Sequence, residues 1–181
     1  VVARYASICQ KVGIVPIVEP EILIDGEHGI EQAAAVCSNV LHEVFAALYN
    51  HHVHLELMIL KTSMVTCGKN HKPFSSADDV ANFTLMVFMN HVPAAVPTIN
   101  FLSGGQTPEQ ATENLNAINA YGPHPWNISF SYGRALQEDC LKAWGGKPEN
   151  IAAAQKALYR AAQQNGLACT AELHGECETT H

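Results

Sequence analysis

The sequence predicts an α/β protein with a parallel sheet or a (β/α) barrel, and its alternating patterns support this prediction. Short apolar runs that are typical of strands alternate with longer amphipathic stretches that are typical of helices. Strands separated by helices of this length run parallel and are joined by right-handed crossovers. The 181 residues, of which 48% are hydrophobic and 15% charged, are enough to bury one core and indicate a single domain.

Each element is predicted from its local pattern. The predicted strands cover residues 14–18, 55–60, 98–102 and 126–130. The predicted helices cover residues 29–49, 76–91, 107–120, 134–143 and 150–164, and residues 1–12 read as part of a further helix. Ser76 and Thr107 are suitable helix starts, because a side-chain oxygen accepts hydrogen bonds from free amides of the first turn, and Pro108 suits that turn. After the opening helix the order is therefore βαβαβαβα.

Charge and hydropathy exclude two classes of partner. The net charge of −7 and the ten Lys and Arg residues, spread thinly along the chain, argue against nucleic-acid binding, which requires clustered basic residues. No apolar run reaches the roughly 18 residues of a membrane span, and the first residues lack the order of a signal peptide. We therefore expect no nucleic acid and no membrane among the partners.

The cysteines indicate a reducing compartment. None of the six forms a CxxC pair, and they are Cys9, Cys37, Cys67, Cys140, Cys169 and Cys177. Reduced thiols in a cytoplasmic protein are the simplest interpretation, although Cys169 and Cys177 are close enough in sequence to pair.

Lys61 is the strongest candidate for catalysis. It stands at the end of the apolar run 57–60, and two carboxylates, Glu19 and Glu21, close an earlier apolar run. Burial disfavours the ammonium form of a lysine and supplies the free amine that attacks a carbonyl to form a Schiff base. Glu19 would then donate and accept the proton, whereas the alternative for Lys61 is a solvated loop charge.

Two glycine-containing loops follow the third and fourth predicted strands. The first contains Ser103, Gly104 and Gly105, and the second contains Gly133 and Arg134. Glycine lets backbone amides approach an anion closely, a following helix N-terminus favours negative charge, and Arg donates two parallel hydrogen bonds. Because chemistry in parallel α/β proteins lies at the carboxyl ends of the strands, these loops predict a phosphate site near Lys61.

Two other groups of residues suggest more ordinary roles. His51, His52 and His54 lie where a helix ends and a strand begins, without the spacing of rigid metal ligands, so we expect no metal site. Met86, Phe88 and Met89 are expected in the core or in a subunit interface.

Several motifs together resemble the class I fructose-bisphosphate aldolases, and the likeness runs from the start of the chain to about Cys169. The matching segments are Val15-Pro16-Ile17-Val18-Glu19-Pro20-Glu21-Ile22-Leu23, Leu60-Lys61 with Met64-Val65, Phe101-Leu102-Ser103-Gly104-Gly105-Gln106, Asn114-Leu115-Asn116-Ala117-Ile118-Asn119, Ser131-Tyr132-Gly133-Arg134-Ala135-Leu136-Gln137 and Leu141-Lys142-Ala143-Trp144-Gly145-Gly146-Lys147.

The resemblance implies a TIM-type (β/α)8 barrel, of which residues 1–181 match the second half, about four βα units. It implies a lyase that cleaves fructose 1,6-bisphosphate to dihydroxyacetone phosphate and glyceraldehyde 3-phosphate in glycolysis, without metal or cofactor. Lys61 matches the Schiff-base lysine and Glu19 the acid/base. The matches to the substrate-binding site are Glu21, Ser103, Gly104, Gly133 and Arg134. Preference between fructose 1,6-bisphosphate and fructose 1-phosphate stays open.

The sequence also departs from the family. The first half of the barrel, with the family's other active-site lysines, arginine and aspartate, is not matched, and the family's tyrosine-ending tail is absent from residues 177–181. Because the sequence begins without Met and within a helical pattern, we expect an N-terminal portion to be missing. Thr62-Ser63 stands where the family usually has Pro-Asn, which is expected to loosen the turn that aims Lys61. Asn90-His91 replaces arginines on a helix that faces other subunits, so the usual tetramer is in question.

Four parallel strands cannot close a barrel, and their open edges require cover. A complementing chain, a second copy of this chain or an open sheet each meet this requirement. Two functions of different class therefore remain: a Schiff-base lyase, or a catalytically incomplete relative that acts as a phosphate-binding or scaffold protein.

Overall fold

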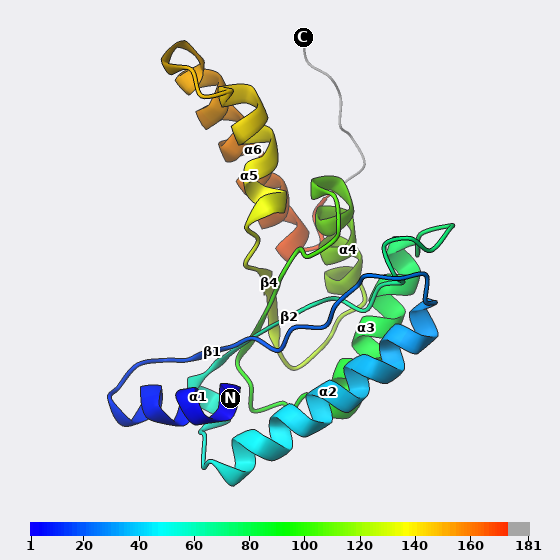
Figure 1. Ribbon diagram of the computed structural model, residues 1–181, viewed down its shortest axis with the longest axis vertical. Coiled ribbons are helices and arrows are strands. Elements are labelled where there is room, and N and C mark those ends of the chain that lie inside the picture. The colour runs from blue at the N-terminus through cyan, green and yellow to red at the C-terminus, as the bar shows by residue number, and fades with distance from the viewer. Residues whose placement is uncertain (174–181) are drawn as a thin grey trace.

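A computed structural model describes residues 1–173 and contains one parallel sheet with its helices (Figure 1). The strands are β1 (Ile17–Val18), β2 (Ile59–Thr62), β3 (Thr98–Phe101) and β4 (Asn127–Phe130), in the sheet order β1-β2-β3-β4. The helices are α1 (Val2–Lys11), α2 (Ile30–Asn50), α3 (Ala77–His91), α4 (Pro108–Ala120), α5 (Arg134–Trp144) and α6 (Ile151–Cys169). Short 3₁₀ helices cover Leu55–Leu57 and Pro148–Asn150. All three strand pairs are parallel, so the predicted α/β class is confirmed.

Alternate strand residues separate the two faces of the sheet. Leu60, Ile99 and Ile128 are in register and 0–2% exposed. Phe101 is also fully buried and stacks on Phe88 of α3, with ring centroids 5.7 Å apart. We name this side the covered face, and the opposite side, which bears Lys61 and Asn100, the open face, because side chains of successive strand residues point to opposite sides.

The helices form two groups around this sheet. In Figure 1, α2 and α3 lie side by side below the sheet, and α5 and α6 form a helical hairpin that extends away from the end of β4. Two N-terminal capping interactions begin helices at the predicted residues. The Ser76 hydroxyl accepts from the Asp79 N–H, and Thr107 forms a capping box with Gln110 at the start of α4.

The second strand differs from the prediction for residues 55–60. Residues 55–57 form a 3₁₀ turn, and β2 begins at Ile59. The Gln10 side chain of α1 binds the backbone of His54 and Leu57, which ties this segment to α1 rather than to a neighbouring strand. Lys61 therefore lies inside β2 instead of following it.

Two other boundaries were also predicted wrongly. The first strand contains only Ile17 and Val18, because Ile14 is held by the Cys9 carbonyl in the turn that ends α1. The last helix continues five residues beyond Gln164, although Asn165 and Gly166 are typical of a helix end. Asn165 is buried and accepts a hydrogen bond from Thr112 of α4, a tertiary contact that sequence patterns do not reveal.

Met86, Phe88 and Met89 divide between core and surface. Phe88 is fully buried, whereas Met86 and Met89 are 50% and 60% exposed. The expected core position is thus confirmed for Phe88. The predicted interface role of the two methionines stays a prediction.

Candidate active site

The centre of the site is an ion pair on the open face. Lys61 Nζ lies 3.1 Å from Glu19 Oε1, and the two side chains are 21% and 44% exposed. Lys61 comes from β2, and Glu19 directly follows β1, so the pairing of Val18 with Leu60 brings both side chains to the same point. The pair combines a partly buried nucleophile with a proton acceptor at hydrogen-bond distance.

Backbone hydrogen bonds hold Lys61 from both sides. The Ile59 N–H donates to the Pro16 carbonyl, and the Leu102 N–H donates to the Thr62 carbonyl. The strand therefore continues through Thr62. The Thr62 hydroxyl is buried without a hydrogen-bond partner in the described part of the chain.

A row of polar side chains continues from Lys61 across the open face. Asn100 and Ser129 are in register with Lys61, and the Thr98 hydroxyl donates to Asn100 Oδ1 at 2.8 Å. At the free edge of β4, the Ser129 hydroxyl lies 3.5 Å from the Cys169 thiol. A polar row on one face of an otherwise apolar sheet is suited to a hydrophilic ligand rather than to packing.

Tyr5 of α1 fixes the strand that carries Glu19. Its hydroxyl donates to the Ile17 carbonyl. Burial raises the pKa of Tyr5, with smaller contributions from Cys9 and Glu19, so the hydroxyl keeps its proton and remains a donor. The N-terminal helix therefore helps to position one half of the ion pair.

A cavity of about 290 Å³ lies at the carboxyl ends of the strands. Its walls come from residues after β1, from the loops after β2 and β3, and from the start of α5. The lining residues are Glu21, Ile22, Leu23, Ile24, Asp25, Ser63, Lys69, Leu102, Gly104, Gly105 and Arg134. We name this space the strand-end cavity.

Two cationic side chains line the strand-end cavity, and they differ in whether they have an ion-pair partner. Lys69 forms an ion pair with Asp25, and the hydrogen bond from Lys69 is the main cause of the lowered pKa of Asp25. Arg134, at the first turn of α5, is exposed and has no ion pair or side-chain hydrogen bond within residues 1–173. The Arg134 guanidinium is therefore available for an anion such as a phosphate.

The loop after β3 contributes backbone rather than side chains. Gly105 has a φ of +78°, and a Cβ at this position would lie 1.5 Å from Ile24 Cδ1. Behind the loop, Asn114 Nδ2 donates to Gln106 Oε1 at 2.6 Å, and the Gln106 amide reaches the Met64 sulfur. These hydrogen bonds hold the loop against α4 and the segment that follows β2.

Tyr132 fixes the other glycine-containing loop, which carries Gly133. Its buried hydroxyl donates to the Ala111 carbonyl of α4 at 2.9 Å, and burial raises its pKa far above the ordinary range. The turn through Gly133 is thereby anchored next to α4, and α5 begins at Arg134.

The structure brings together only part of the predicted site. Glu21, Gly104 and Arg134 line the strand-end cavity, whereas Ser103 is buried and Gly133 is exposed outside the lining. Lys61 and Glu19 form their pair on the open face and do not line this cavity.

Sequence reasoning missed Asp25, Lys69 and Ser63. Lys69 follows Lys61 by eight residues in the loop after β2, and a cation in a strand-end loop was the signal that could have identified it. No group of three or more His, Cys, Asp or Glu side chains that could hold a metal ion occurs in residues 1–173.

A family model described as glycolytic, class-I fructose-bisphosphate aldolase, matches residues 1–181. The chain belongs to the class I fructose-bisphosphate aldolases. A fructose-bisphosphate aldolase of Echinococcus multilocularis is 51% identical over 99% of this chain and 50% of its own length. Fructose-bisphosphate aldolase 2 of Caenorhabditis elegans is 53% identical over 97% of this chain and 48% of its own length. The chain thus spans about half the length of the relatives that it matches.

A solved structure supports the same family. The fructose-bisphosphate aldolase of Plasmodium falciparum, in complex with TRAP and a small molecule inhibitor, has a TM-score of 0.94 with this chain at 50% sequence identity. The match covers 97% of this chain and 50% of that chain. The parallel sheet with alternating helices is therefore part of a TIM-type α/β barrel, as the resemblance implied.

The relatives of this family occupy more than one compartment. Arabidopsis thaliana proteins that are 51–52% identical to this chain include a cytosolic and a chloroplastic aldolase. No helix within residues 1–173 has the length and apolar character needed to cross a membrane.

Proposed function

We propose that this chain carries the Schiff-base half of a class I fructose-bisphosphate aldolase site and serves glycolysis. Lys61 is the nucleophile, and Glu19 is the acid/base. The observation that carries this proposal is the 3.1 Å pair of Lys61 and Glu19 on the open face of the sheet, beside a cavity with an unpaired arginine.

The pair accounts for the first chemical steps. Glu19 accepts a proton from the Lys61 ammonium, and the free amine attacks the ketone carbon of the substrate, forming a carbon–nitrogen bond. The protonated Glu19 then returns its proton to the departing hydroxyl, which leaves as water. The resulting iminium withdraws the electron pair released when the C3–C4 bond breaks.

The strand-end cavity supports a sugar-phosphate substrate. Arg134 has no competing anion, and the N–H of Gly104 is free of backbone and side-chain hydrogen bonds in the described residues. A guanidinium and an unpaired amide beside a helix N-terminus are suited to a phosphate group. Glu21 lines the same cavity and would contact the hydroxyl groups of the sugar.

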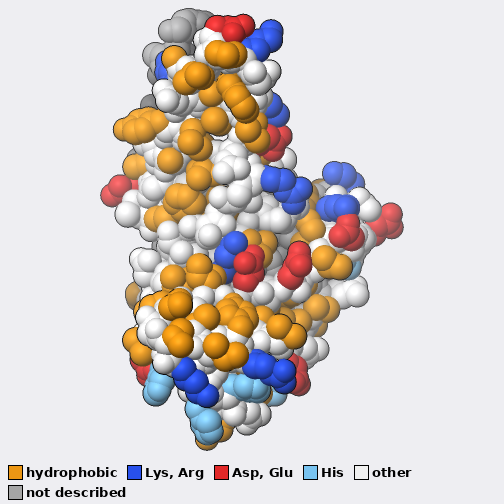
Figure 2. Space-filling view, turned by 60° about the vertical axis from the view of Figure 1, so that its left-hand side comes forward, with side chains coloured by type: hydrophobic (Ala, Val, Ile, Leu, Met, Phe, Trp, Pro, Cys, Tyr) orange, Lys and Arg blue, Asp and Glu red, His pale blue; other side chains and the backbone are white. Residues whose placement is uncertain are grey.

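The sheet edges support a complementing chain or a second copy as partner. In the described chain, β1 pairs only with β2 and β4 only with β3. Figure 2 shows hydrophobic side chains gathered on the lower part of one face of the molecule. Exposed apolar residues lie in α1, in β1 and between them, and they are Ile8, Val12, Ile14, Val15 and Ile17. A partner chain that covers this surface would pair with the free edge of the sheet and would complete the walls of the site.

We also propose a cytosolic location. Cys9, Cys37, Cys67, Cys140 and Cys169 all have free thiols, as expected in a reducing compartment. Cys177 lies outside the described residues, so the alternative of a Cys169–Cys177 pair stays open.

Borohydride trapping with dihydroxyacetone phosphate tests the proposal. Reduction converts the iminium to a stable amine, which intact mass and peptide mapping locate. We expect one adduct, on Lys61. Absence of this adduct from folded protein at saturating ligand would favour the non-catalytic, phosphate-binding relative instead.

A further inference from the structure

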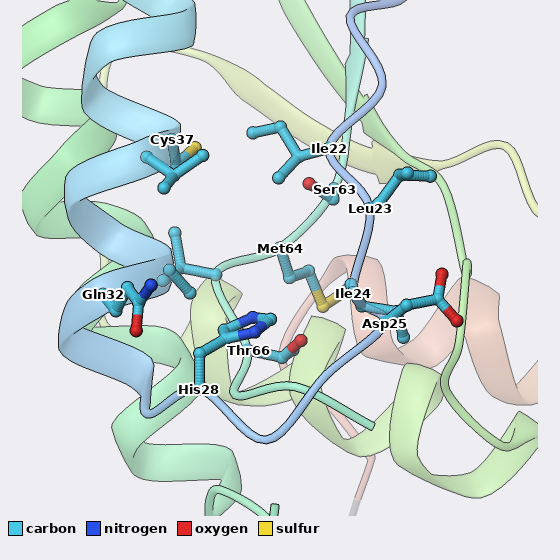
Figure 3. Close-up of a pocket in the computed structure, with 13 residues that line it drawn as sticks. Ile22, Leu23, Ile24, Asp25, His28, Gln32, Cys37, Ser63, Met64 and Thr66 are labelled. Carbon is cyan, nitrogen blue, oxygen red and sulfur yellow. The ribbon is translucent and has the colours of Figure 1, made fainter. Parts of the chain in front are cut away.

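A second cavity, of about 210 Å³, adjoins the strand-end cavity, with which it shares residues 22–25 and Ser63. Figure 3 shows its lining. Residues 22–25, here named the 22–25 strap, form one wall of each cavity. The opposite wall of the second cavity is α2, and its floor is the segment 63–66 that continues β2. We name it the strap cavity.

Small side chains on α2 leave this space open. Ala33 and Val36 face the strap, and Ile22 and Met64 complete an apolar lining. Figure 3 shows Ile22 near Cys37 at one end and Thr66 near His28 at the other. Polar groups therefore lie at both ends of the cavity, with Ser63 beside Ile22 and Thr66 beside His28.

Several polar side chains of the lining have unused hydrogen-bonding capacity. Within residues 1–173, no hydrogen bond is formed by the side chains of Gln32, Ser63 or Thr66. Ser63 and Thr66 are only 6% and 4% exposed. Both residues line the cavity, so each hydroxyl can form a hydrogen bond with a ligand there.

The charges of the lining disfavour an ionic ligand. No Lys or Arg lines the strap cavity, and the one carboxylate, Asp25, is already paired with Lys69. Burial raises the pKa of the Cys37 thiol to about 12, so this thiol stays neutral. An anion that entered the cavity would lose hydration without gaining a Lys or Arg as countercharge. The strand-end cavity, which Arg134 lines, instead favours an anionic ligand.

The volume limits the ligand to a single ring. A cavity of about 150 Å³ with apolar walls accepts benzene, whereas drug-sized ligands require roughly 300–1,000 Å³. We propose that the strap cavity is a binding site for a small neutral aromatic ligand with one hydroxyl or amide group. The ring would lie against the apolar lining, and its polar group would bind the hydroxyl of Thr66.

Methyl NMR of methionine-labelled protein tests this site directly, because the chain has only four methionines. Met64 lines the cavity, and Met58, Met86 and Met89 do not. The methyl signal that disappears in the Met64→Leu variant is assigned to Met64. We expect phenol to shift the Met64 signal saturably, with a Kd of about 1 mM, and to leave the other three unchanged. Benzoate, the anionic probe of similar size, should bind at least about tenfold more weakly, since its carboxylate would be buried unpaired.

Two pairs of variants sharpen the test. Val36→Phe fills the cavity and should abolish the Met64 shift, whereas Ala35→Phe, on an exposed position of the same helix, should preserve it. Thr66→Val removes a hydroxyl at constant shape and should weaken phenol about threefold to tenfold, while Thr66→Ser should retain binding. If Val36→Phe does not fold, the comparison of Thr66→Val with Thr66→Ser tests binding in the strap cavity.

The proposal would be overturned by any of three results: an unsaturable shift, equal shifts with phenol and benzoate, or equal effects of the paired variants. Because the readout is a methyl signal rather than aldolase chemistry, these results are independent of the borohydride experiment.

Discussion

The two faces of the sheet use the same strands for different purposes. On β3, Ile99 and Phe101 are fully buried on the covered face, and Asn100 between them lies in the polar row of the open face. On β2, Leu60 is buried in the core, and the next residue, Lys61, pairs with Glu19. Neighbouring positions therefore differ in what they contribute: one set holds the sheet against its helices, and the other supplies chemistry.

The largest expected effect is on the open face. Lys61→Met removes the amine that is paired with Glu19 and should abolish the borohydride adduct completely. The free energy of unfolding, measured with urea, should change little. The control is Lys69→Met, which removes a cation from the strand-end cavity and should retain the adduct with weaker ligand binding. An adduct that survives in Lys61→Met would place the reactive amine elsewhere.

On the covered face, Phe101→Ala should lower the free energy of unfolding by about 3–5 kcal/mol, since it deletes a buried ring that stacks on Phe88. Its neighbour Asn100→Ala should cost less than about 1 kcal/mol. Urea unfolding followed by circular dichroism measures both. Equal losses for the two variants would contradict the separation of the faces.

A smaller effect is expected for Glu19→Gln, which retains the shape of the side chain but cannot accept the lysine proton. Adduct formation should slow about 100-fold, with little change in stability, because an ion pair between partly exposed groups contributes weakly. Quenched-flow trapping gives the rate. Glu21→Gln is the matched control, and the role of Glu19 would be refuted if both variants were slowed equally.

The smallest effect concerns a helix that packs beneath the covered face. Thr107→Ala removes the capping box at the start of α4 and should cost about 1 kcal/mol of stability. Thr107→Ser, which keeps the hydroxyl, should restore most of this loss. Adduct formation on Lys61 should be the same in all three proteins, and a slower reaction in Thr107→Ala would link the cap to the site.

Periodicity predicted the covered face well and the site only in part. Alternating apolar residues located the strands near Leu60, Ile99 and Ile128, because burial on one face imposes a period of two. The 3₁₀ turn at 55–57 was missed because it depends on Gln10, more than 40 residues away. Asp25 and Lys69 were missed for the same reason, since their pairing joins two loops that are distant in sequence.

The contact between Gly105 and Ile24 has a consequence for how this site can diverge. Any side chain added at position 105 would meet the Ile24 side chain and would also have to accept a positive φ. A replacement at 105 therefore requires the Ile24 side chain to move aside or to be smaller, whereas a smaller residue at 24 leaves Gly105 undisturbed. The two positions are therefore coupled, and a change at 105 is easier after residue 24 has become smaller.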